Sequence, residues 1–177
     1  SRLVMGVDNQ HDISHAAAMF DDYVERGGNA FDTAWVYGCE KVLGDWVKLR
    51  GIRDRIVLLG KGAHTPFCTP EGLTSQLRES LDRLQMDHLD LYMMHRDNPD
   101  VPVGEFVDVL DGHLKAGRMR AIGVSNWSLE RVQAFNADAA KRGKTPLVAV
   151  SNQFSLAAAV DLPWQGCRTA RDDAWRT

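Results

Sequence analysis

Five polar residues each follow a short apolar run, and their types and positions make them the first candidates for chemistry. They are Asp32, Lys61, His95, Asn126 and Gln153. Asp32 ends the run that begins at Ala30, and Tyr37 follows it five positions later. Because a carboxylate is almost never buried without a partner, Asp32 needs a cation from elsewhere in the chain. Lys61, at the end of the next apolar run, is the predicted partner.

A tyrosine beside such an ion pair is a candidate general acid. A nearby ammonium favours the phenolate, so we expect Lys61 to lower the pKa of Tyr37 from its ordinary value of about 10. His95 can exchange a hydrogen bond with the same oxygen or with a bound carbonyl. A tunable phenol, a lysine and a histidine suit general acid catalysis on a carbonyl group. Ser125, Asn126 and Gln153 supply hydroxyl and amide groups, which could hydrogen-bond to a carboxamide and so fix the plane of the ring that carries it.

Taken singly, each of these residues is more often a solvated or hydrogen-bonded loop residue, so the fold must bring them together. Short apolar runs predict six strands, at residues 3–7, 30–32, 56–59, 89–94, 121–124 and 147–150. Helical spacing of apolar residues follows each of the first five strands. A sixth helix begins around residues 172–175.

Cap and stop residues delimit these predicted helices. The first begins at Asp12 or Ser14 and closes at residues 26–28, and the second covers residues 40–48. The third begins at Thr69-Pro70-Glu71, which combines a cap, a first-turn proline and an acid. The fourth opens at Pro102 and stops at Gly117, whereas the fifth runs from a Ser128 cap to Gly143.

Strict alternation of strands and helices indicates a parallel β/α architecture. No G-x-G-x-x-G pattern follows the first strand, which argues against a doubly wound dinucleotide fold. Polar residues at the carboxyl ends of five strands instead match the face of a (β/α)8 barrel on which active sites are built. We therefore predict a single TIM-barrel domain over residues 1–177, represented by about six of its eight units.

Length bears on how this barrel is completed. A (β/α)8 barrel needs roughly 250 residues, whereas this chain has 177. The first and sixth strands would be left as unpaired edges, which favour aggregation. We therefore expect a fragment of a longer polypeptide; the alternative is an open or swapped assembly in which a second copy covers the edges.

Composition excludes several classes of function. The net charge of −3 and the lack of a basic cluster give no electrostatic reason to expect nucleic acid. No apolar run of about 18 residues suggests a membrane span. The three cysteines are odd in number and far apart, which argues for a reducing, cytoplasmic setting. His11 and His15 have helical metal-ligand spacing, but no third ligand is near, so we expect no metal site.

Three segments resemble the aldo-keto reductase superfamily. The first runs from Asp32-Thr33-Ala34 through Glu40 to Leu43-Gly44, with Tyr37 inside it. The second is Leu89-Asp90-Leu91-Tyr92 with His95, and the third is Gly123-Val124-Ser125-Asn126. The resemblance covers essentially the whole chain.

This resemblance implies a barrel that reduces small-molecule aldehydes or ketones with NADPH. Tyr37 would then protonate the carbonyl oxygen, Lys61 would lower the tyrosine pKa, Asp32 would hold Lys61, and His95 would orient the carbonyl. The nicotinamide site would comprise Ser125, Asn126 and Gln153, with Asp32 counted among the cofactor-binding residues as well. The family's 2′-phosphate pocket would lie after Thr177, so NADPH rather than NADH rests on the resemblance alone.

Other interpretations remain open. The chain could be a non-catalytic relative, like the channel-associated β subunits of this superfamily, or a truncated and inactive piece. The loop His95-Arg96-Asp97-Asn98-Pro99 is more charged than in many members. We expect that loop to be solvated; the alternative is that Arg96 or Asp97 shapes a polar substrate mouth. The sequence does not indicate which carbonyl compound is the substrate or how many copies assemble.

Overall fold

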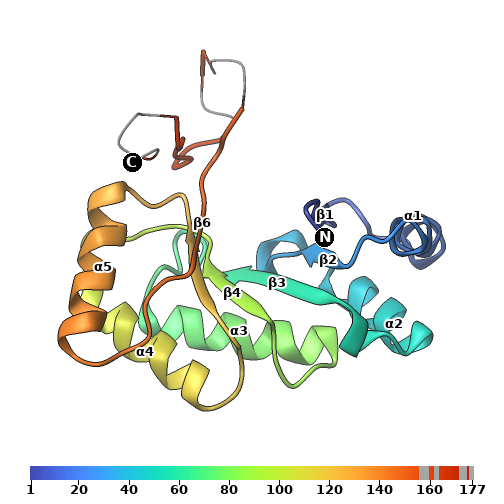
Figure 1. The fold of residues 1–177 in the computed structure, drawn as a ribbon, viewed down its shortest axis with the longest axis horizontal. Coiled ribbons are helices and arrows are strands. Elements are labelled where there is room, and N and C mark those ends of the chain that lie inside the picture. Colours follow the sequence, from blue (N-terminus) through green and yellow to red (C-terminus); the bar gives the residue numbers. More distant parts are fainter. Residues whose placement is uncertain (156–159, 162–163, 172–174, 176–177) are drawn as a thin grey trace.

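Six parallel strands, arranged in the order in which they occur in the chain, form the centre of the molecule. The computed structural model describes residues 1–155, 160–161, 164–171 and 175. The strands curl into an open arc, and the helices that connect them lie along its outer side (Figure 1). This arrangement confirms the predicted β/α barrel architecture, with six strands in the described part of the chain.

The elements alternate throughout. The strands are β1 (Met5–Gly6), β2 (Ala30–Asp32), β3 (Val57–Gly62), β4 (Leu91–Met94), β5 (Ile122–Ser125) and β6 (Ala149–Ser151). The α-helices are α1 (Ile13–Glu25), α2 (Glu40–Arg50), α3 (Pro70–Leu84), α4 (Val103–Lys115) and α5 (Leu129–Lys141). Two short 3₁₀ helices, η1 (Trp35–Tyr37) and η2 (Arg53–Arg55), lie on either side of α2. None of the described helices is long and apolar enough to span a membrane.

Side-chain caps fix three of the helix starts at the residues predicted. Asp12 accepts a hydrogen bond from the backbone N–H of His15 at 2.8 Å, so it is Asp12 rather than Ser14 that caps α1. Thr69 caps α3 with Pro70 in its first turn, and Ser128 caps α5. Each cap satisfies an N–H that the helix itself leaves unpaired.

The main hydrophobic core lies between the strands and the helices. Successive strand residues point to opposite faces, and in β3, β4 and β5 the residues that face the helices are buried: Leu58, Tyr92, Met94, Ile122 and Val124. The other face of each strand points to the inside of the arc. Val57 on that inner side of β3 is 39% exposed.

The bounds of every strand except β2 differ from the prediction by one to three residues. β1 is only two residues long, because Leu3 and Val4 are exposed and have no partner strand to cover them. β3 extends past Leu59 to Gly62, since its backbone continues to pair with β4 at Lys61↔Met93 and Gly62↔Met94. Lys61 therefore lies within a strand rather than after one. The predicted sixth helix falls on residues outside the described part of the chain.

A close helix contact explains the glycine of the first family-like segment. Gly44 lies in α2, where a Cβ atom would be 2.4 Å from the backbone oxygen of Leu84 at the end of α3. Only a residue without a side chain allows α2 and α3 to approach this closely. The Leu43-Gly44 pair therefore serves helix packing rather than chemistry.

Candidate active site

The carboxyl ends of the strands surround a cavity of about 430 Å³. All seven residues singled out in the sequence line this cavity: Asp32, Tyr37, Lys61, His95, Ser125, Asn126 and Gln153. They come from five different strands or the turns that follow them, so the parallel sheet brings together residues that are far apart in the chain. This is the position at which barrel folds carry their active sites.

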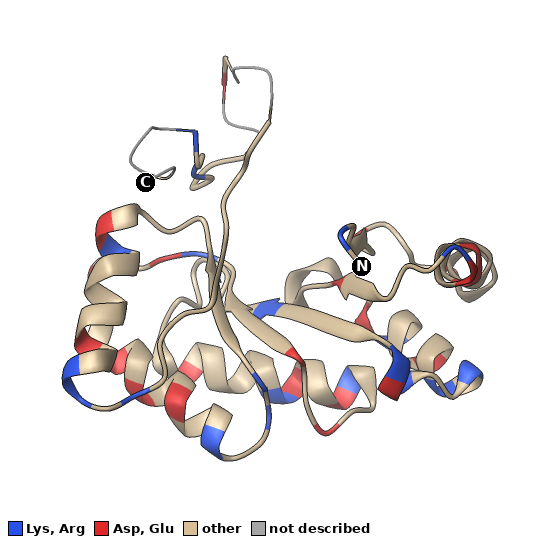
Figure 2. Cartoon of the chain, in the orientation of Figure 1, with Lys and Arg blue, Asp and Glu red and all other residues tan. Residues whose placement is uncertain are grey.

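Charge within the sheet is confined to one ion pair. Figure 2 shows Lys, Arg, Asp and Glu mainly on the helices and connections. Asp32 and Lys61 are the only charged residues in the six described strands, and the Lys61 ammonium is bound to the Asp32 carboxylate. The Lys61 side chain is 6% exposed, so the carboxylate supplies the compensation that a buried ammonium requires. The predicted pairing is present.

Tyr37 is aimed at this pair by a tight turn. After β2 the chain forms η1, and the N–H of Tyr37 donates to the carbonyl of Ala34 at 3.0 Å. Gly38 follows with a φ of +70°, a conformation that glycine adopts without a steric penalty. The turn places the tyrosine ring 5.2 Å, centroid to ammonium nitrogen, from Lys61. The half-buried ring also stands edge-on to His95, with centroids 5.7 Å apart.

The expected direction of the Tyr37 pKa is wrong for this structure. Burial in the cavity wall, followed by the negative charge of Asp32, raises the pKa of Tyr37 to about 12. The ammonium of Lys61 is already neutralised by Asp32, whereas the loss of water around the phenol penalises the phenolate directly. Tyr37 is consequently a neutral hydrogen-bond donor at physiological pH.

His95 is held neutral beside the tyrosine. Burial, together with the positive charges of Lys61 and Arg96, lowers the pKa of His95 to about 3. Its backbone N–H donates to the carbonyl of Gly62 at 2.6 Å, which fixes the residue at the end of β4. A neutral imidazole offers one N–H donor and one acceptor. His95 can therefore donate to a carbonyl oxygen without placing a second cation next to Lys61.

The ends of β5 and β6 provide a wall of hydroxyl and amide groups. Ser125 donates to the carbonyl of Ser151 at 2.7 Å, and Asn126 donates to both Ser125 Oγ and the carbonyl of His95. Asn126 Oδ1 accepts from the backbone N–H of Arg168. Both amide hydrogens of Asn126 are thus used inside the protein, and its remaining capacity is that of an acceptor.

The β6 end adds two further amide side chains to this wall. Gln153 is half-buried at the cavity, and its Nε2 reaches Ser155 Oγ at 3.4 Å. Asn152 donates to the carbonyl of Trp127, whereas its buried Oδ1 has no hydrogen-bond partner in the described part of the chain. An unpaired buried acceptor is costly, which makes Asn152 Oδ1 a position that a ligand N–H would satisfy.

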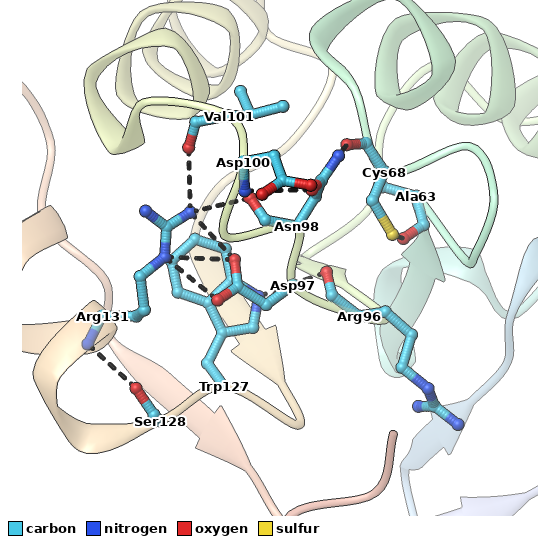
Figure 3. A network of polar contacts seen from close by, with 10 residues as sticks. All are labelled: Ala63, Cys68, Arg96, Asp97, Asn98, Asp100, Val101, Trp127, Ser128 and Arg131. Atoms are coloured by element: carbon cyan, nitrogen blue, oxygen red, sulfur yellow. Dashed lines mark hydrogen bonds and ion pairs between the residues drawn. The ribbon is translucent and has the colours of Figure 1, made fainter. Parts of the chain in front are cut away.

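The loop after β4 is a fixed structure rather than the solvated segment expected. Arg131 of α5 binds Asp97 through Nε and Nη2, the latter at 2.9 Å from Oδ1, and donates to the carbonyls of Asn98 and Val101 (Figure 3). The guanidinium also lies over the Trp127 ring, 5.2 Å from its centroid. Asp97 is therefore committed to Arg131 and does not shape the cavity mouth.

Arg96 takes the opposite direction, which fits the alternative that this residue shapes a polar substrate mouth. In Figure 3 its side chain extends away from Asp97 and Arg131, and it lines the cavity with an exposed fraction of 9%. His64 also lines the cavity, 5.0 Å from His95 between ring centroids. Neither residue ends an apolar run; Arg96 was therefore only an alternative in the sequence analysis, and His64 was missed. Across the described residues, no group of three or more His, Cys, Asp or Glu side chains is arranged to hold a metal ion.

Comparison with known proteins decides the family. The model of the Aldo/keto reductase family matches residues 4–166. The chain belongs to this family. The match includes every residue of the site described above, from Asp32 to Gln153.

Curated relatives agree with this assignment. Aldo-keto reductase YhdN of Bacillus subtilis is 34% identical over 142 residues, which cover 75% of this chain and 42% of the relative. The uncharacterized oxidoreductase YrpG of the same organism is 31% identical, covering 88% of this chain and 55% of the relative. A 6-dehydroglucose reductase of Novosphingobium aromaticivorans is 30% identical, with 73% and 47% covered. The chain spans about half the length of the curated relatives it matches.

Proposed function

We propose that the protein containing this chain reduces an aldehyde or ketone to an alcohol with NADPH, and that Tyr37 is the general acid. The observation that carries the proposal is the convergence, on one cavity, of a neutral tyrosine, a neutral histidine and a lysine paired with an aspartate. Membership of the aldo/keto reductase family supports a nicotinamide-dependent oxidoreductase.

Tyr37 has the protonation state that this reaction requires. Hydride addition to a carbonyl carbon leaves a negative oxygen, which is a far stronger base than a phenolate. A tyrosine with a pKa of about 12 is fully protonated at neutral pH and can still give its proton to that oxygen. As the proton leaves, the Lys61 ammonium near the ring stabilises the phenolate that forms.

His95 and the ion pair would supply position and electrostatics. Neutral His95 donates a hydrogen bond to the carbonyl oxygen and orients it towards Tyr37. Asp32 keeps Lys61 in place, because their contact lies within neighbouring strands of one sheet. These preorganised groups act where charge develops during the reaction.

The wall at β5 and β6 fits the carboxamide of a nicotinamide ring. A carboxamide needs acceptors for its N–H groups and a donor for its oxygen. Asn126 and the unpaired Asn152 Oδ1 offer acceptors, and Gln153 offers a side-chain amide donor. When bound, the reduced cofactor would supply the hydride, while the protein positions both reactants.

A direct assay tests this function. The full-length protein is mixed with NADPH and a reactive aromatic aldehyde, and cofactor oxidation is followed by absorbance, with NADH in a parallel series. Aldehyde-dependent oxidation of NADPH is expected. Tight NADPH binding without turnover of any aldehyde or ketone would instead indicate the non-catalytic, regulatory role. The presence of all four residues of the acid site argues against that role.

A further inference from the structure

An arginine that the reaction above does not use lies in the wall of the cavity. Arg96 follows His95 directly, and its Nη1 donates to the His95 carbonyl at 2.9 Å. The same carbonyl accepts from Asn126, and Trp127 Nε1 donates to the Arg96 carbonyl at 3.3 Å. Main chain and side chain are thus both fixed, so the guanidinium has a defined place beside the site.

The positive charge of Arg96 has no counter-ion in the described part of the chain. Asp97, its neighbour, is bound to Arg131, and Asp32 is bound to Lys61. Asp8 lines the same cavity but forms no ion pair with Arg96. A guanidinium is always ionised, and a charge buried to this degree normally has a partner. Because one N–H of the guanidinium donates to the His95 carbonyl, its other N–H groups remain available to bind an anion.

We propose that Arg96 binds an anionic group of the substrate, so that the cavity takes carbonyl compounds that carry a carboxylate. The inference rests on the proposed carbonyl reduction and adds the class of substrate. A guanidinium matches a carboxylate with two parallel hydrogen bonds, which fixes orientation as well as adding affinity. Arg96 adjoins His95, so the carbonyl of such a substrate would be turned towards Tyr37.

Substitutions at Arg96 can separate charge from packing. Arg96→Gln keeps an N–H donor for the His95 carbonyl and loses the charge, whereas Arg96→Lys keeps the charge. Arg55→Met is a matched control, because it removes one exposed positive charge from η2, outside the cavity. Each variant is made in the full-length protein.

The substrates are pairs that share a carbonyl and differ in charge. We would measure kcat/KM with NADPH for 4-carboxybenzaldehyde and its methyl ester, and for succinic semialdehyde and its methyl ester. The wild type is expected to favour the acid in at least one pair. Arg96→Gln should lower the acid-to-ester ratio of that pair about tenfold or more, as the loss of charged hydrogen bonds implies. Arg96→Lys should retain part of the preference, and Arg55→Met all of it.

Two results would overturn the proposal: an ester preference in both pairs of the wild type, or an acid-to-ester ratio that Arg96→Gln leaves unchanged. In the second case, a weakened Kd for NADPH would assign Arg96 to a phosphate of the cofactor.

An equilibrium measurement keeps this test independent of turnover. If no aldehyde is reduced at all, the proposed function fails, and benzoate binding to the NADP⁺-loaded protein decides the role of Arg96. Tryptophan fluorescence would report that binding. Binding that Arg96→Gln abolishes supports the anion site, and equal binding by the wild type and Arg96→Gln contradicts it.

Discussion

At the scale of single residues, Tyr37 shows how burial can outweigh a nearby charge. A lysine close to a phenol lowers its pKa when the ammonium acts alone. Here Lys61 is shared with Asp32, and the cavity wall removes water from the tyrosine ring, so its pKa rises to about 12. The residue is therefore held in its protonated form, and in the proposed reaction the lysine would act on the phenolate only when the proton leaves.

This protonation state can be measured by the ultraviolet absorbance of phenolate. At pH 10 an unperturbed tyrosine would be about half ionised, whereas one with a pKa of about 12 is about 1% ionised. The cofactor-free wild type and Tyr37→Phe should therefore show the same phenolate absorbance at pH 10. An additional half-equivalent of phenolate in the wild type would mean that Lys61 dominates after all.

At the scale of elements, close contacts between helices explain why some residues without a proposed catalytic role have the identity they do. The family-like segment from Asp32 to Gly44 has two parts: the first carries the proposed acid site, and the second packs α2 on α3. Gly44 is needed because the Leu84 carbonyl occupies the space of a side chain.

Replacing either of two helical glycines by alanine should change the free energy of unfolding in opposite directions. Gly44→Ala forces the Cβ against backbone atoms at 2.4 Å, and overpacking of this kind costs about 1–3 kcal/mol. Gly112, exposed in α4, has open space around its Cβ position. Gly112→Ala should stabilise the protein by about 0.5–1 kcal/mol, because alanine loses less backbone entropy in a helix. Urea unfolding of both variants measures these changes. A stability gain for both would show that α2 and α3 are not in close contact.

The sequence predicted where helices and strands lie, but not the contacts between side chains of different elements. Periodic apolar runs and caps such as Asp12 and Ser128 located the strands and helices, because these signals are local. The ion pair between Arg131 and Asp97 was not predictable, because it depends on how α5 packs against the loop after β4. For the same reason the direction of Arg96, buried in the cavity wall rather than solvated, required the structure.

At the scale of the whole molecule, ion pairs between helices and connecting segments link distant parts of the chain. Asp111 of α4 is 1% exposed; it binds Lys115 at 2.8 Å and Lys144, before β6, at 3.2 Å. It also accepts from the N–H and hydroxyl of Thr145 at 3.1 Å. The ion pair with Lys115 and these further contacts hold the pKa of Asp111 well below its ordinary value.

This carboxylate should make stability depend on pH in the acid range. A pKa that folding lowers contributes stability above the unfolded value of about 3.9, and that stability is lost as the pH falls through the folded value. Asp111→Asn should lower the free energy of unfolding by about 2 kcal/mol at pH 7, and by progressively less below about pH 4. Asp54→Asn is the control, because Asp54 is exposed and forms no ion pair within the described part of the chain. A deficit for Asp111→Asn that is constant from pH 7 to pH 3 would contradict the assignment.

The sheet as a whole places the proposed acid site and the amide wall at one end of six parallel strands. The sequence predicted this convergence, because polar residues end apolar runs in a parallel fold. The proton states of Tyr37 and His95 could not be predicted, because both depend on how much water the assembled cavity excludes.

The most direct test of the central claim replaces the proposed acid. Tyr37→Phe removes only the hydroxyl, and Tyr23→Phe, at a tyrosine outside the cavity, is the control. Turnover of an aromatic aldehyde with NADPH should fall by about 100-fold or more in Tyr37→Phe, the contribution of a general acid, while the Kd for NADPH stays within about threefold. Near-normal turnover by Tyr37→Phe would show that the proton comes from another group and that the assignment of the acid is wrong.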